Sequence, residues 1–121
     1  MILHLVSAAV WDAVPVGGSY APPSLATEGF VHCTGDDAVL LQVANAFYRE
    51  LGGDVVALSL DEARLTSETR WEPPAHINAD GPQPAAGLFP HVFGPLERDA
   101  VVLERRFTRA ADGRYMGFEP G

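Results

Sequence analysis

The sequence predicts an α+β fold with small, mainly antiparallel sheets, one main helix and one shorter helix. Apolar runs of strand length recur along the chain, whereas a helical period of about 3.6 residues marks only two stretches. The strands and helices are segregated rather than alternating as a repeated βαβ unit requires, which favours antiparallel pairing. A length of 121 residues is typical of one domain, so we expect residues 1–121 to form a single domain.

The chain begins with a predicted strand and a short helix. Residues 2–6 form an apolar run with His4 at its centre, as in a buried strand. Ser7 is a favourable N-cap for a helix over about residues 8–14, whose apolar side chains follow helical spacing. A single helical turn is then expected over residues 24–29, where a glycine ends it.

The main helix follows a second short strand, predicted at residues 30–33. Thr34 is the expected N-cap, because two aspartates come shortly after it, where the helix dipole favours negative charge. The glycine pair at 52–53 is the expected end of this helix. Its apolar face is predicted to carry Val39, Leu40, Val43, Ala44, Phe47 and Leu51.

The second half of the chain predicts further strands and one long connection. Residues 73–88 carry four prolines and little apolar pattern, and a connection of that length is uncommon in a compact domain. Residues 111–113 are typical of a hairpin turn that leads into an edge strand at 114–118. The other strands are expected at residues 55–60, 69–72, 91–94 and 100–107.

The charge balance excludes several functions. Sixteen acidic residues face eight basic ones, giving a net charge of -8, and this disfavours binding to nucleic acid or to anionic lipid. All eight basic residues are arginines. The lack of lysine excludes a pyridoxal Schiff base, a lysine nucleophile and a Walker-type phosphate loop.

Cysteine content and hydropathy predict the cellular compartment. Cys33 is the single cysteine, so an internal disulfide is excluded, and without a cationic neighbour in the sequence it is expected to be a small buried residue. No apolar run approaches the roughly 20 residues that a membrane span needs. The N-terminus also lacks the pattern of a signal peptide. We therefore expect a soluble cytoplasmic protein without a membrane partner.

Three histidines are the first candidates for a functional site. His4, His32 and His91 lie in or beside predicted strands, where an imidazole needs a hydrogen-bond partner or a shifted pKa. The structural alternative for each is a histidine whose hydrogen bonds are satisfied within the sheet. Ser7 and Thr34 stand where these strands turn into helices, and such junctions also offer backbone N–H groups to an anion.

Two further residues complete the candidate set. Glu72 ends a predicted strand beside the long connection, and it is either a general base, a group that stabilises a developing cation, or an exposed strand-end carboxylate. Tyr20 has an aromatic ring that either stacks on a ligand or fills the core.

These residues recur within a longer pattern. It comprises His4 with Ser7 and Trp11, residues 18–20 and 23–25, the segment Glu-Gly-Phe-Val-His-Cys-Thr at 28–34, and residues 44–48, 58–65, 70–72 and 88–96. Together, over roughly residues 2–107, they resemble the family called domain of unknown function 952, small bacterial proteins of this length.

The resemblance implies a fold similar to that of the ADP-ribosyltransferases, which bind NAD between two small sheets without a metal. His4 then matches the first-strand residue that holds the adenosine ribose, and His32 resembles the second motif residue. Paired histidines of this kind are nearest to the RNA 2′-phosphotransferases. This chain departs from them at Leu3, where they have an arginine, and its negative charge suits RNA poorly.

The resulting hypothesis is a nucleotide-type pocket around one cleft, with NAD as the cofactor implied by resemblance and with NAD-dependent transferase or NAD-cleaving chemistry. His4, Ser7, Tyr20 and Thr34 are predicted to bind the ligand, and His32, Glu72 and His91 to act in catalysis. A small molecule or nucleotide is the expected partner, and no metal is expected. Two alternatives stay open: a non-catalytic module that binds a small molecule, and a metal hydrolase using the three histidines.

Overall fold

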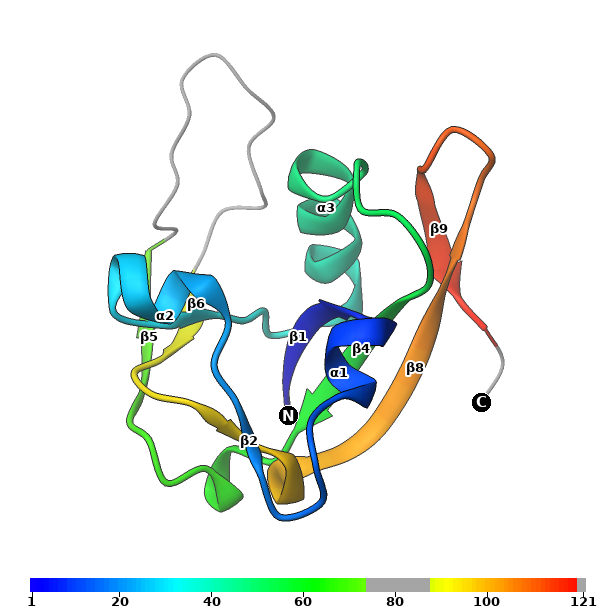
Figure 1. The fold of residues 1–121 in the computed structure, drawn as a ribbon. Coiled ribbons are helices and arrows are strands. Elements are labelled where there is room, and N and C mark those ends of the chain that lie inside the picture. Colours follow the sequence, from blue (N-terminus) through cyan, green and yellow to red (C-terminus); the bar gives the residue numbers. More distant parts are fainter. Residues whose placement is uncertain (74–87, 120–121) are drawn as a thin grey trace.

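The computed structural model describes residues 1–73 and 88–119, and it has the predicted α+β architecture of small antiparallel sheets and a few helices (Figure 1). The strands are β1 (Ile2–Ser7), β2 (Ser19–Tyr20), β3 (Val31–His32), β4 (Val55–Leu60), β5 (Thr69–Glu72), β6 (Phe89–Val92), β7 (Leu96–Glu97), β8 (Val101–Arg109) and β9 (Tyr115–Phe118). The α-helices are α1 (Ala8–Asp12), α2 (Pro23–Glu28) and α3 (Asp37–Phe47), and single 3-10 turns cover Glu62–Arg64 and Arg98–Ala100.

The largest sheet has the strand order β1-β4-β8-β9 and is antiparallel throughout. Every residue of β4 is buried, because both faces of the sheet are covered. On one face Leu3 and Leu5 pack with Leu40 and Ala44 of α3. His4 points to the other face, since successive side chains of a strand alternate.

A second sheet has the order β3-β6-β5 and stands beside the first. His91 of β6 lies opposite both His32 of β3 and Arg70 of β5, so these three side chains share one face. Leu3 and Thr34 join the two sheets by exchanging backbone hydrogen bonds of 2.8 Å in both directions. This bridge fixes the first strand against the third.

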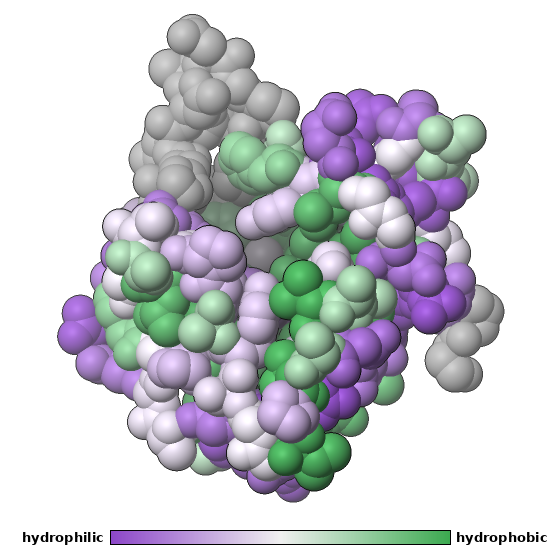
Figure 2. Space-filling model, in the orientation of Figure 1, coloured by the Kyte–Doolittle hydropathy of each residue, from purple (hydrophilic) through white to green (hydrophobic). Residues whose placement is uncertain are grey.

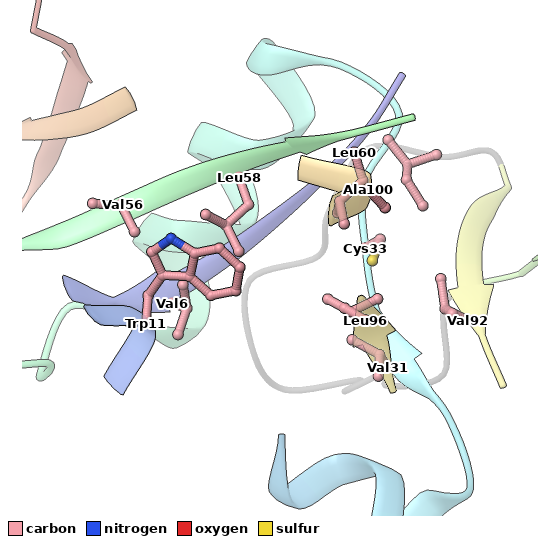
Figure 3. Close-up of a cluster of buried hydrophobic side chains, with 11 residues drawn as sticks. Val6, Trp11, Val31, Cys33, Val56, Leu58, Leu60, Val92, Leu96 and Ala100 are labelled. Atoms are coloured by element: carbon pink, nitrogen blue, oxygen red, sulfur yellow. The ribbon is translucent and has the colours of Figure 1, made fainter. Parts of the chain in front are cut away.

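The main core fills the space between the two sheets (Figure 3). Trp11 of α1 packs over Leu58 and Val6, while Cys33 and Val92 approach from the smaller sheet. Cys33 is free and buried as predicted, and burial raises the pKa of its thiol. None of the described helices is long and apolar enough to cross a membrane.

The helix boundaries differ from the prediction at several points. Ser7 caps α1 as expected, but the helix ends at Asp12, before the predicted end near Val14, the residue in which Pro15 disfavours the helical conformation. Thr34 is not the N-cap of α3: it forms the bridge to Leu3, and the Asp36 carboxylate instead accepts from the Val39 N–H at 2.8 Å. The helix α3 ends at Phe47, well before the predicted glycine pair.

The short elements agree with the prediction only in part. The helix α2 runs from Pro23 to Glu28, one residue earlier than the predicted segment 24–29, and Gly29 ends it as expected in a left-handed conformation with φ of 87°. The strands β2 and β7 pair with each other over two residues and were not predicted. The hairpin turn before β9 and the edge position of that strand are confirmed. The predicted connection 73–88 lies, except for its two end residues, outside the described residues.

Candidate functional site

Three histidines from three strands meet beside the bridge between the sheets. The bridge sets β1 against β3, and His4 Nδ1 lies 2.7 Å from the backbone oxygen of His32. Pairing of β3 with β6 places the ring of His91 at a centroid distance of 5.7 Å from the ring of His32. The fold therefore brings together His4 and His91, which are 87 positions apart in the sequence.

His4 has a defined protonation state and tautomer. Its pKa is lowered from 6.5 to about 4, mainly by burial and to a smaller extent by the nearby His32, against the opposing effect of the backbone hydrogen bond. The imidazole is therefore neutral at neutral pH. Because a carbonyl oxygen can only accept, Nδ1 carries the proton and Nε2 keeps a lone pair. His4 thus presents a hydrogen-bond acceptor on the face of its strand that looks toward the smaller sheet.

His91 forms a couple with Glu72. The Nδ1–H of His91 donates to the Glu72 carboxylate at 2.9 Å, across the neighbouring strands β5 and β6. The imidazole is only 3% exposed, whereas the carboxylate is 38% exposed. Phe30 stacks on the imidazole with a centroid distance of 4.3 Å. A carboxylate that fixes one ring nitrogen leaves the other oriented for proton transfer, an arrangement typical of acid–base sites.

A second couple was not predicted from the sequence. His32 Nε2–H donates at 2.7 Å to the carboxylate of Glu28, the last residue of α2. The left-handed Gly29 ends the helix between them and turns the chain back into β3. Phe30 was missed as well, although its ring contacts both His32 and His91. The one usable signal was Gly29, since a glycine C-cap directly before a strand folds that strand back over the helix end.

Tyr20 lies next to His4, as predicted for a site residue. Its ring centroid is 5.8 Å from that of His4 and 6.4 Å from that of Trp11. The short β2–β7 pairing holds the tyrosine there, and partial burial raises the pKa of its phenol. Trp11 is itself fixed, because its Nε1–H donates to Glu104.

Ser7 and Thr34 do not join this group. Ser7 lies three positions after His4, so strand alternation turns it to the opposite face, and its hydroxyl accepts from the Val10 N–H at 3.2 Å. Thr34 pairs with Leu3, on the face that α3 covers, and its buried hydroxyl has no hydrogen-bond partner in the described part of the chain. The structure therefore brings together five of the seven predicted residues: His4, Tyr20, His32, Glu72 and His91.

The geometry of the histidines also bears on the metal alternative. Within residues 1–73 and 88–119, no group of three or more His, Cys, Asp or Glu side chains is arranged to hold a metal ion. Each of the three histidines instead has one ring nitrogen bound to a protein oxygen: the carbonyl of His32, the carboxylate of Glu28 or that of Glu72.

Comparisons with known proteins identify a family and a fold. The model of a family described as "Protein of unknown function (DUF952)" matches residues 5–104, in agreement with the resemblance found in the sequence. Two crystal structures of protein CC0527 from Caulobacter crescentus, one of them a double mutant, are similar to this chain with a TM-score of 0.74. They are 22% and 23% identical, and each match covers 95% of this chain and 92% of the other. None of the curated proteins matches.

Proposed function

The chain belongs to the DUF952 family of proteins of unknown function, and from its own site we propose that it binds an NAD-type nucleotide and carries out transferase or NAD-cleaving chemistry. The proposal includes an architecture like that of the ADP-ribosyltransferases. Its main support is the state of His4, a neutral imidazole with a fixed acceptor nitrogen beside an aromatic ring.

That nitrogen suits a sugar hydroxyl. A ribose hydroxyl donates readily to a lone pair, and burial strengthens such a bond because water competes less for it. A neutral imidazole also offers no attraction to an anion, so His4 selects hydroxyl over phosphate. The ring of Tyr20, 5.8 Å away, provides an apolar wall for the sugar or its base.

The two carboxylates support the chemical part of the proposal. When bound, NAD supplies a bond between nicotinamide and ribose whose cleavage develops positive charge on the sugar. Glu72 and Glu28 hold negative charge beside His91 and His32, and negative charge close to a developing cation lowers the barrier. The His91 couple can also hold or release a proton at its second nitrogen.

The residues fit the ribose of such a ligand better than its phosphates. Ser7 and Thr34, at first candidates for a phosphate contact, lie on the face opposite His4. The proposal therefore assigns ligand contacts to His4 and Tyr20, and chemistry to His32, Glu72 and His91.

Calorimetric titration with NAD, followed by chromatography of the incubated mixture for free nicotinamide, tests the proposal. We expect binding to the wild type and strongly weakened binding to His4→Phe, which keeps a ring but removes the acceptor. Val16→Ala is the matched control, because this side chain is 89% exposed and outside the site. If NAD does not bind and no nicotinamide is released, the proposal is refuted. If NAD binds but is recovered unchanged, the site serves recognition without catalysis.

A further inference from the structure

The chain has few cations to offer a ligand, and the structure locates all of their side chains. All eight basic residues are arginines, and every one lies within residues 1–73 and 88–119. Residues 74–87 contain no arginine or lysine. Among the side chains, only the described arginines could therefore give a phosphate group at the histidines a permanent positive charge.

Most of these arginines are committed elsewhere. Arg98 donates to the backbone oxygens of Trp11 and Val14, and Arg109 donates to four backbone oxygens around the turn before β9. Four others pair with carboxylates away from the histidines: Arg49 with Asp112, Arg64 with Asp61, Arg105 with Asp37 and Arg106 with Asp54. Arg114 precedes β9, on the opposite side of the molecule from β5 and β6, where Figure 2 shows hydrophilic side chains gathered (Figures 1 and 2).

Arg70 is the arginine closest to the site in strand register. It lies opposite His91 in the β5–β6 pairing. Its guanidinium, however, donates to Glu68 at 2.9 and 3.0 Å and lies over the ring of Phe93, 4.6 Å from the centroid. Arg70 is thus paired with Glu68, the residue before β5, and is also attracted by Glu72 of the site.

The site itself carries negative charge. Glu28 and Glu72 each accept a hydrogen bond from one imidazole, of His32 and His91 respectively. A phosphate at this place would meet two carboxylates, and like charges repel; within residues 1–73 and 88–119, the arginine nearest in strand register is already paired with Glu68.

On the premise of the proposed function, we infer that the histidine site recognises the nucleoside part of its ligand, a ribose with its base, and gives the phosphates no cationic partner. The ligand class is thereby narrowed from nucleotides in general to molecules with an accessible ribose that are uncharged or positively charged at the site. The phosphates of a dinucleotide would remain toward solvent.

Two matched ligand pairs test this inference by calorimetry: adenosine against AMP, and nicotinamide riboside against its 5′-phosphate. In whichever pair binds, we expect the Kd of the nucleoside and the Kd of its phosphate to differ by less than about threefold. We also expect the Kd of NAD to change little when salt is raised, because salt mainly screens contacts between exposed charges. A loss of affinity greater than about threefold on removal of the phosphate would overturn the inference. In that case NAD would still bind, so the proposed function would stand.

Arg70→Gln is the matched variant. This substitution is expected to leave the Kd of AMP and the Kd of adenosine unchanged, because the guanidinium of Arg70 forms an ion pair with Glu68. Weaker binding of AMP alone would show that Arg70 leaves Glu68 for the phosphate and would overturn the inference. Absence of binding by NAD and by every nucleoside and nucleotide tested would instead refute the proposed function, and the inference with it.

Discussion

At the scale of single residues, the buried His4 links stability to pH. Its pKa is about 4 in the folded protein and 6.5 in the unfolded chain, so between these values the unfolded chain takes up a proton that the folded protein does not. The free energy of unfolding therefore has its full value, as far as His4 is concerned, above pH 6.5, and it falls as the pH decreases toward 4. The expected loss is about 3 kcal/mol over this window.

Urea denaturation at several pH values between 7 and 4 measures this loss. Carboxylates such as Asp37 have a pKa lowered by a hydrogen bond, here from Arg105. Their contribution to the free energy of unfolding is lost only as the pH falls below the usual pKa of an aspartate. The window above that pKa therefore reports mainly on His4. The variant His4→Gln should show a flatter pH dependence there, and an equally steep decline in this variant would contradict the assignment.

The tautomer of His4 is a second prediction at this scale. Its Nδ1–H donates to the His32 carbonyl, so the proton must reside on Nδ1, whereas free neutral imidazole has a mixture of both forms. Long-range ¹H–¹⁵N spectra at pH 7 should show a protonated Nδ1 and an unprotonated Nε2. A proton on Nε2 would remove the acceptor on which ligand recognition is proposed to depend.

The sequence predicted the candidate residues better than their relative orientation. His4, His32 and His91 were identified because imidazoles in apolar strands need partners, and the structure supplies those partners. Ser7 and Thr34 were grouped with them by proximity in sequence, but alternation along β1 and the pairing of Thr34 with Leu3 send both to the other face. Strand pairing of this kind depends on distant residues, so no local pattern reveals it.

At the scale of elements, periodicity predicted β4, β8 and α3, which have enough residues for a pattern to repeat. The two-residue strands β2 and β7 are too short to carry such a pattern, and they form by pairing with each other. The end of α3 depends on tertiary contacts too. Asn45 of α3 makes two side-chain hydrogen bonds to the backbone of Tyr115 in β9, which ties the helix to the edge of the sheet.

The turn before β9 allows a matched test of a close approach. Gly113 and Gly53 both have positive φ, 92° and 72°, where an L residue costs about 1–2 kcal/mol. A Cβ on Gly113 would also lie 2.6 Å from the backbone oxygen of Arg49, whereas one on Gly53 would meet nothing within 4 Å. We expect Gly53→Ala to lower the free energy of unfolding by about 1 kcal/mol and Gly113→Ala by about 2–4 kcal/mol. Equal losses in urea denaturation would show that the turn shifts freely away from Arg49.

At the scale of the whole molecule, the site depends on two sheets being held as one unit. The bridge between Leu3 and Thr34 and the core around Trp11 join them, and the histidines of the site come from both sheets. Separation of the sheets would move His4 away from the His32 carbonyl. The integrity of the site and of the fold should therefore be lost together.

We accordingly predict one cooperative unfolding transition for this chain. In Trp71→Phe the remaining Trp11 is 1% exposed and reports on the core between the sheets, while far-ultraviolet circular dichroism reports on all elements. Trp71 is a suitable residue to replace, because it is 45% exposed. The urea midpoints from the two signals should coincide, and the amides of Leu3 and Thr34 should exchange with the free energy of global unfolding. Two separate midpoints, or faster exchange at this bridge than in β4, would mean that the smaller sheet opens on its own and that the histidine site exists only in part of the population.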